Sequence, residues 1–222
     1  MQDKLLIWDF DGVIADTEII WLKNRMELLN ERFNLGWDIE TTNFHLGGKS
    51  DNIKREDLQK LGIITDEDFW NTAYKKDMET IAKTGFKLTD GIEEIFKIKK
   101  FAQCIATSGS KVKTDLKIKT VGIQKYFPEE RVFTIDDVKH GKPAPDLFLH
   151  AAKVMGYKPE NCVVVEDSIA GMTAATTANM TVITFIGSPM YHNDKYFEAI
   201  KKLGIKNIFY NMSDIKNFLE KL

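Results

Sequence analysis

The chain has 222 residues, enough for one large core or for a core domain that carries a smaller inserted domain. Its 31 basic residues nearly balance its 33 acidic residues, so the field of the whole protein attracts neither nucleic acid nor an anionic membrane surface. The first apolar run is too short and too quickly acidic for a signal peptide or a membrane span, which predicts a cytoplasmic protein. A core of this size needs no partner subunit to be stable, so we expect a monomer.

The first predicted element is the apolar run 5–8, which has the pattern of a strand buried on both faces of a sheet. Similar strand patterns follow at residues 103–106, 132–134, 163–165 and 182–186, and each ends in polar residues. Helical patterns occur at residues 91–99, 110–121, 145–155, 171–178 and 213–222. This alternation predicts an α/β protein with a Rossmann-like parallel sheet, whose chemistry lies beyond the carboxyl ends of the strands.

Residues 15–86 interrupt the alternation, because they show amphipathic helical patterns and no convincing strand. Thr65 and Asp68 match a capping box ahead of one of these helices. In the first helix, apolar side chains recur at steps of three and four residues: Ile19, Leu22, Met26, Leu29 and Phe33. The sequence therefore predicts an all-helical cap domain, residues 15–86, inserted into a catalytic core of residues 1–14 and 87–222, where it could close over a substrate.

Two carboxylates follow the first strand directly, in the segment Asp9-Phe10-Asp11-Gly12. Asp9 is placed to attack phosphorus as a nucleophile, and Asp11 is placed to protonate the leaving-group oxygen and later to activate water. The alternative is that the two acids only cap a turn or a helix. The spacing by itself leaves both interpretations open.

Glu166 and Asp167 follow the strand predicted at 163–165, and in a parallel sheet they lie at the same edge as Asp9. Mg²⁺ prefers oxygen ligands and keeps several waters while it joins carboxylates to a substrate phosphate. We therefore expect a Mg²⁺ site formed by Asp9, Asp167 and the carbonyl of Asp11, with Glu166 as a ligand through water. Asp167 could instead be a helix cap.

Two separate segments have side chains suited to phosphate binding: a turn with two hydroxyls, and a loop with a lysine. Thr107, Ser108 and Gly109 follow a strand and open a helix, so a hydroxyl and several backbone N–H groups face the place of a phosphate. Ser110 is equally suited to cap that helix. Lys142 lies on a loop bounded by prolines, where its ammonium could neutralise the phosphate and the nucleophile. Most lysines are solvated surface groups, so this role depends on the other motifs.

Taken in order, these segments resemble the four motifs of the haloacid dehalogenase superfamily, and they span nearly the whole chain. The matching segments are Asp9-Phe10-Asp11-Gly12-Val13, Thr107-Ser108-Gly109, Lys142-Pro143-Ala144-Pro145-Asp146 and Val165-Glu166-Asp167-Ser168. The resemblance implies a Rossmann-like core, a helical cap between the first and second motifs, a required Mg²⁺ ion and phosphoryl transfer through the first aspartate. Haloacid dehalogenases proper attack carbon and do not need the second aspartate, so Asp11 argues against that chemistry.

The subgroup that the chain resembles contains beta-phosphoglucomutase, phosphoglycolate phosphatase and sugar-phosphate phosphatases such as 6-phosphogluconate phosphatase, which differ mainly in the cap. The mutases carry a histidine ten residues after the second aspartate of the first motif, and an arginine in a cap loop. Here the first position is Trp21, and the loop 45–50 contains no arginine. The resemblance implies that His45, Lys49 or their neighbours contact the leaving group, unless this loop is simply solvated.

The sequence thus predicts a Mg²⁺-dependent phosphoric monoester hydrolase that acts on a small metabolite, a sugar phosphate or sugar-acid phosphate, through an aspartyl-phosphate on Asp9. A sugar phosphomutase would use the same intermediate, but the missing histidine and arginine count against it. A non-catalytic protein that binds sugar phosphates is a third hypothesis, and the intact Asp9, Asp11, Lys142 and Asp167 argue against it.

Overall fold

The computed structural model describes residues 3–188 and 191–222. In this part of the chain, six strands form one parallel sheet in the order β3-β2-β1-β4-β5-β6. The strands are β1 (Lys4–Trp8), β2 (Phe101–Ala106), β3 (Val132–Phe133), β4 (Cys162–Glu166), β5 (Thr181–Phe185) and β6 (Ile208–Phe209). The predicted α/β fold with a Rossmann-like parallel sheet is therefore confirmed.

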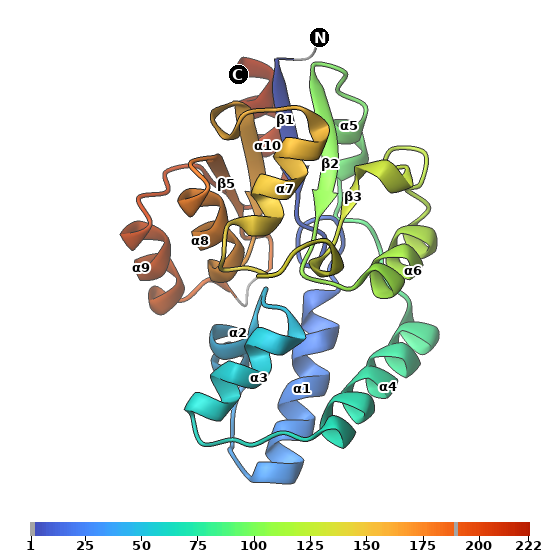
Figure 1. Ribbon diagram of the computed structural model, residues 1–222, viewed down its shortest axis with the longest axis vertical. Coiled ribbons are helices and arrows are strands. Elements are labelled where there is room, and N and C mark those ends of the chain that lie inside the picture. Colours follow the sequence, from blue (N-terminus) through green and yellow to red (C-terminus); the bar gives the residue numbers. More distant parts are fainter. Residues whose placement is uncertain (1–2, 189–190) are drawn as a thin grey trace.

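The helices alternate with these strands except in one long segment between β1 and β2 (Figure 1). They are α1 (Glu18–Phe33), α2 (Ile39–Leu46), α3 (Asp51–Lys60), α4 (Glu67–Thr84), α5 (Ile92–Phe96), α6 (Lys111–Val121), α7 (Asp146–Met155), α8 (Ile169–Thr177), α9 (Asp194–Lys202) and α10 (Met212–Lys221). The sequence patterns missed α9 and the two-residue strand β6. The capping box expected at Thr65 and Asp68 is wrong, because the Asp66 side chain accepts from Phe69 N (2.8 Å) at the start of α4.

The central strand β1 is apolar along its length because both faces of the sheet are covered. Successive side chains of a strand point to opposite faces. Leu5 and Ile7 accordingly belong to the core beneath α7 and α8, while Leu6 and Trp8 belong to the core that includes side chains of α5 and α10. This double cover fixes the register of β1 and thereby the place where the strand ends.

Helices α1 to α4, which we call the helical unit, lie beyond the carboxyl ends of the strands (Figure 1). Two connecting segments lie side by side at the entrance to this unit, where Ala15 forms a bridge with Leu88 and Thr89 N donates to Ile14 O (2.9 Å). The helical unit has a hydrophobic core of its own: Leu22, Leu28, Leu29, Leu46, Leu58, Ile63, Phe69, Trp70 and Ala73. Its boundaries as a domain at 15–86 stay a prediction.

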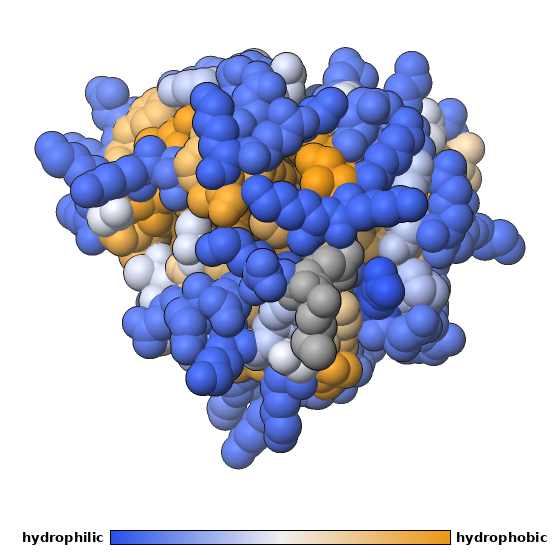
Figure 2. All heavy atoms as spheres, turned by 90° about the horizontal axis from the view of Figure 1, so that it is seen from above, coloured by the Kyte–Doolittle hydropathy of each residue, from blue (hydrophilic) through white to orange (hydrophobic). Residues whose placement is uncertain are grey.

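On the face of the molecule opposite the helical unit, hydrophilic side chains cover most of the surface and apolar ones show between them (Figure 2). Within residues 3–188 and 191–222, none of the helices combines the length and the apolar character needed to cross a bilayer.

Candidate active site

The strand order brings the polar motifs to one edge of the sheet. Asp9 follows β1, Asp167 follows β4 and Thr107 follows β2, and these three strands are neighbours. Asp9 N donates to Val165 O (3.0 Å), which continues the hydrogen bonding between β1 and β4. In parallel sheets, ligands bind outside the carboxyl ends of the strands, where the strand order reverses. Here that point lies between β1 and β4.

Lys142 lies between two buried carboxylates. Its Nζ donates to Asp9 Oδ1 at 2.5 Å and to Glu166 Oε1 at 2.6 Å, and its side chain is completely buried. The other oxygen of Glu166, Oε2, accepts from Ser168 N (2.7 Å) and Ser168 Oγ (2.9 Å). Gly171 of α8 packs directly against the Glu166 carboxylate, since a Cβ there would lie 1.7 Å from Oε1. Glu166 therefore orients Lys142, which in turn orients Asp9.

The charges of this buried group shift one another's pKa values. Burial by itself lowers the pKa of Lys142, but Asp9 and Glu166 together raise it above its usual value, so the ammonium is charged at neutral pH. Burial raises the pKa of the Asp9 carboxyl to about 8; Lys142 opposes that rise, and the neighbouring charges of Glu166 and Asp11 add to it. The ammonium thus favours the ionised form of Asp9, which is the form that can attack phosphorus.

The carboxylate of Asp11 joins the helical unit to the sheet. Oδ1 accepts from Trp21 Nε1 of α1 (2.8 Å) and from the hydroxyl of Thr17, and Oδ2 accepts from Lys117 Nζ of α6 (2.5 Å). Burial raises the pKa of Asp11, but these donors, with Lys117 foremost, hold it below its usual value. In this arrangement Asp11 is an ionised carboxylate.

Asp167 packs against the turn that follows Asp9. Gly12 has φ +83°, and a Cβ at Gly12 would lie 1.8 Å from Asp167 Oδ2, so the turn accepts only glycine at this position. The hydroxyl of Tyr191 donates to Asp167 Oδ2. Asp167 is 1% exposed, and its carboxylate is held in place from two sides.

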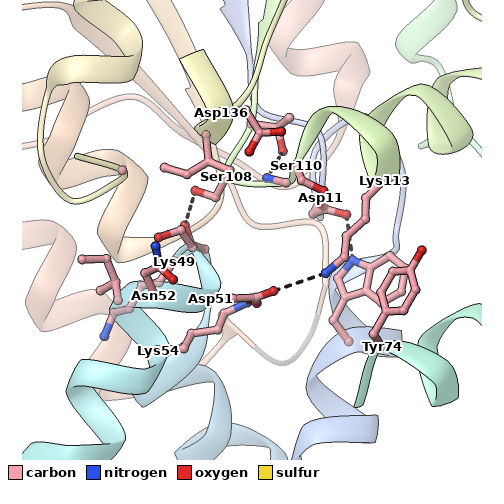
Figure 3. Close-up of a pocket in the computed structure, with 18 of the residues that line it drawn as sticks. Asp11, Lys49, Asp51, Asn52, Lys54, Tyr74, Ser108, Ser110, Lys113 and Asp136 are labelled. Carbon is pink, nitrogen blue, oxygen red and sulfur yellow. Dashed lines mark hydrogen bonds and ion pairs between the residues drawn. The ribbon is translucent and has the colours of Figure 1, made fainter. Parts of the chain in front are cut away.

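The turn 107–110 lies between β2 and α6. Thr107 Oγ1 accepts from Gly109 N (3.2 Å), and Ser108 Oγ donates to the carbonyl of Gly48 in the helical unit (2.9 Å; Figure 3). Ser110 is the N-cap residue of α6 by its backbone, without a side-chain cap hydrogen bond. Asp136 Oδ2 accepts from Lys111 N (2.8 Å), so one amide at this helix start already has a partner.

In the loop of the helical unit, the side chains of His45 and Lys49 contact other residues of that unit, and their expected contact with a leaving group stays a prediction. The His45 ring stacks on Trp37 at 4.9 Å between centroids, and Lys49 Nζ donates to Asp57 Oδ2 (2.7 Å) and to the carbonyl of His45 (2.6 Å). Both side chains are engaged within the helical unit. The loop instead contacts the sheet through Gly48, where a Cβ would lie 2.0 Å from Ser168 Oγ.

A cavity of about 430 Å³ lies between the helical unit and the strand ends. Asp9, Asp11 and the turn 107–110 line one side of it. The side formed by the helical unit includes Arg25, Lys49, Asp51, Lys54 and Tyr74 (Figure 3). His45 is not among the residues that line this cavity. Its size is that of a pocket for a small molecule.

Sequence patterns did not indicate Thr17, Lys117 or Tyr191. Lys117 left one signal, because it lies three residues after Thr114 on the buried face of α6, where an unpaired lysine would be costly. A lysine at such a position indicates a nearby carboxylate. Tyr191 is far from Asp167 in sequence and has no comparable signal.

The chain matches the family model of the haloacid dehalogenase-like hydrolases over residues 6–185. It belongs to that family. Among curated haloacid dehalogenase-like relatives, a 6-phosphogluconate phosphatase of Escherichia coli is 25% identical over 195 residues, covering 86% of this chain and 85% of that protein. A fructose-1-phosphate phosphatase of E. coli is 28% identical over 185 residues, covering 80% of this chain and 94% of that protein.

Solved structures agree with this family assignment. A haloacid dehalogenase-like protein of unknown function from Agrobacterium tumefaciens has a TM-score of 0.80 at 26% identity, with 98% of each chain covered. A protein described as a putative beta-phosphoglucomutase from Bacteroides vulgatus has a TM-score of 0.78 at 24% identity, covering 98% of this chain and 87% of that one, and shows the shared fold. The chain is therefore a hydrolase of this family by sequence and by fold.

Proposed function

We propose that this hydrolase is a Mg²⁺-dependent phosphatase that acts on a sugar phosphate or sugar-acid phosphate through an aspartyl-phosphate on Asp9. The observation that carries the proposal is the buried group of Asp9, Lys142 and Glu166, of which Asp9 lines a cavity that the turn 107–110 also lines. A carboxylate suited to act as the nucleophile thus has a buried ammonium as its partner and shares a cavity with hydroxyls and backbone N–H groups. The names of the two curated phosphatases support the substrate class.

The proposed reaction has two halves. In the first, an Asp9 oxygen bonds to phosphorus while the ester bond breaks, and Asp11 gives a proton to the leaving oxygen. In the second, water attacks the phosphorus, Asp11 takes the proton from that water, and the bond from Asp9 to phosphorus breaks to release inorganic phosphate. Lys142 stays charged throughout and neutralises negative charge on the phosphoryl group and on Asp9.

Asp11 has to change partners during this cycle. Because it is ionised while Lys117 and Trp21 hold it, it is ready to act as the base of the second half reaction. To act as the acid of the first half reaction, it must take up a proton and leave Lys117. Trp21 belongs to the helical unit, so we propose that this unit works as a cap whose position controls the partners of Asp11.

The donor set fits Mg²⁺. No cluster of three or more Asp, Glu, His or Cys side chains within the described residues is arranged to hold a metal ion. Mg²⁺ needs only one or two carboxylates beside its waters and a substrate phosphate, which Asp9, Asp167 and the carbonyl of Asp11 would supply. Both oxygens of Glu166 are engaged, so we propose that Glu166 positions Lys142 and leaves the ion to the others. When bound, the ion would offset negative charge on the phosphate.

The test is phosphate release from a panel of phosphorylated sugars and sugar acids, with Mg²⁺ and with a chelator. We expect one substrate class to react only with Mg²⁺, and Asp9→Asn to release no phosphate. Asp115→Asn is the matched control, since Asp115 has an exposed ion pair with Lys111 and should keep full turnover. Full turnover by Asp9→Asn would refute the nucleophile, and an isomerised sugar phosphate without free phosphate would indicate a mutase.

Gly12→Ala tests the place of Asp167 independently. The new methyl group would overlap Asp167 Oδ2, so we expect the carboxylate to move and the Mg²⁺ concentration for half-maximal activity to rise about tenfold. A Mg²⁺ titration of activity measures this. An unchanged midpoint would argue against Asp167 as a ligand.

A further inference from the structure

The cavity is lined by a carboxylate that lies beside two ammonium groups. Asp51 at the start of α3 has Oδ1 3.6 Å from Lys54 Nζ and Oδ2 3.3 Å from Lys113 Nζ of α6. The ring of Tyr74, on α4, lies 5.1 Å from Lys113 Nζ (Figure 3). We call Asp51, Lys54 and Lys113 the Asp51 group. This group connects α3 of the helical unit to α6, which packs beside the sheet.

The Asp51 group carries one positive charge in excess, because two ammonium groups share a single carboxylate. Burial raises the pKa of Asp51, but Lys54, Lys113 and Arg25 hold it well below its usual range, so the carboxylate is ionised. Arg25 itself has a buried ion pair with Asp77. The side chains of Lys54 and Lys113 are 12% and 28% exposed, and both residues line the cavity. Partly desolvated ammonium groups of this kind bind anions strongly.

We propose that Lys54 and Lys113 bind a carboxylate of the leaving group, so that the substrate is a phosphate monoester of a hydroxylated carboxylic acid. This inference rests on the phosphatase function proposed above. Lys113 lies three residues after Ser110, about 4.5 Å further along the helix axis, a separation that a short carbon chain spans.

The charge of the group favours a carboxylate over a second phosphate. A phosphate monoester carries about −1.5 to −2 charges at neutral pH, whereas one carboxylate balances the single excess charge. When the two ammonium groups bind the substrate carboxylate, the Asp51 carboxylate can accept a hydrogen bond from a hydroxyl of the substrate. The same contacts would draw α3 toward α6, which links recognition of the acid to closure of the cavity.

Two pairs of substrates isolate the carboxylate. Gluconate 6-phosphate and glucitol 6-phosphate differ only in a carboxylate against a CH₂OH group, and so do glycerate 3-phosphate and glycerol 3-phosphate. We expect kcat/KM to be at least about tenfold higher for the acid in one pair or both, a factor that one charged hydrogen bond accounts for. Equal values, a preference for the polyol, or turnover of bisphosphates alone would overturn the inference while the phosphatase function stands.

Substitutions assign the effect to the two lysines. Lys113→Met and Lys54→Met should each raise KM for the preferred acid about tenfold with a smaller change in kcat, and should bring the ratio of acid to polyol toward one. Lys119→Met is the matched control, because Lys119 is an exposed lysine of the same helix and should change neither constant. An unchanged ratio in both lysine variants would refute the assignment.

The proposed carboxylate site can be tested even if the protein shows no phosphatase activity. If no substrate, p-nitrophenyl phosphate included, releases phosphate, the proposed function fails. Calorimetric affinities for the same two pairs then test the Asp51 group by itself. Binding of an acid at least about tenfold tighter than its polyol supports the inference, and equal binding overturns it.

Discussion

Lys142→Met is expected to lower phosphate release about 1000-fold and the free energy of unfolding by about 3–5 kcal/mol. Lys142 Nζ is the shared donor to Asp9 and Glu166, and its side chain has no exposed surface. Methionine has a similar length but no charge, so the buried carboxylates of Asp9 and Glu166 would lose their cation. The lost free energy of unfolding is the cost of burying this uncompensated negative charge. Urea unfolding and steady-state kinetics measure the two effects separately.

A double variant separates stability from catalysis. Glu166→Gln in the Lys142→Met background removes one of the two unpaired charges, so it should recover part of the lost stability and none of the lost turnover. Lys153→Met, at an exposed lysine of α7, is the control and should stay within about 0.5 kcal/mol of the native protein. Native turnover in Lys142→Met would exclude a role for this ammonium in the chemistry.

Gly48→Ala is expected to lower kcat/KM about 100-fold, the scale of effect of a displacement of about 1 Å in an active site. Gly48 has φ +68°, its carbonyl accepts from Ser108, and a Cβ would lie 2.0 Å from Ser168 Oγ. The methyl group would push the loop of the helical unit away from the strand ends. The cavity would then open, and the leaving group would lose its fixed position.

Gly36→Ala is the control for backbone strain. Gly36 has φ +64°, close to that of Gly48, but nothing lies within 4 Å of an added Cβ. Both variants should lose about 1–2 kcal/mol of stability from the left-handed conformation, and only Gly48→Ala should lose activity. Equal kinetics in the two variants would show that the contact between Gly48 and Ser168 has no part in turnover.

The residues at the strand ends could be placed from the sequence because the information is local. An apolar run such as 5–8 identifies a strand buried on both faces, and the next residue, Asp9, must then lie at the carboxyl edge. Parallel pairing brings Asp167 and Thr107 to that same edge whichever helices intervene. The approximate positions of α6, α7 and α10 followed from helical periodicity for the same reason.

The contacts of the helical unit could not be placed in this way. The loop resemblance predicted that His45 and Lys49 contact the leaving group; Lys49 pairs with Asp57 and lines the cavity together with Asp51 and Lys54, whereas His45 does not line it. Residues on a helix of 3.6 residues per turn point in different directions around its axis. Which of them face the cavity depends on how α3 packs against its neighbours. A local sequence pattern does not predict this packing.

By itself, the sequence determined the parallel α/β core and the order of its motifs, and it placed Asp9, Thr107 and Asp167 at one edge, because strand burial and strand ends are local properties. Only the tertiary structure decided which cations meet which carboxylates. Lys117 meets Asp11 across 106 residues, and Lys113 meets Asp51 across 62. Such pairs form where two separately folded surfaces pack together, so their partners are set by that packing and not by spacing along the chain.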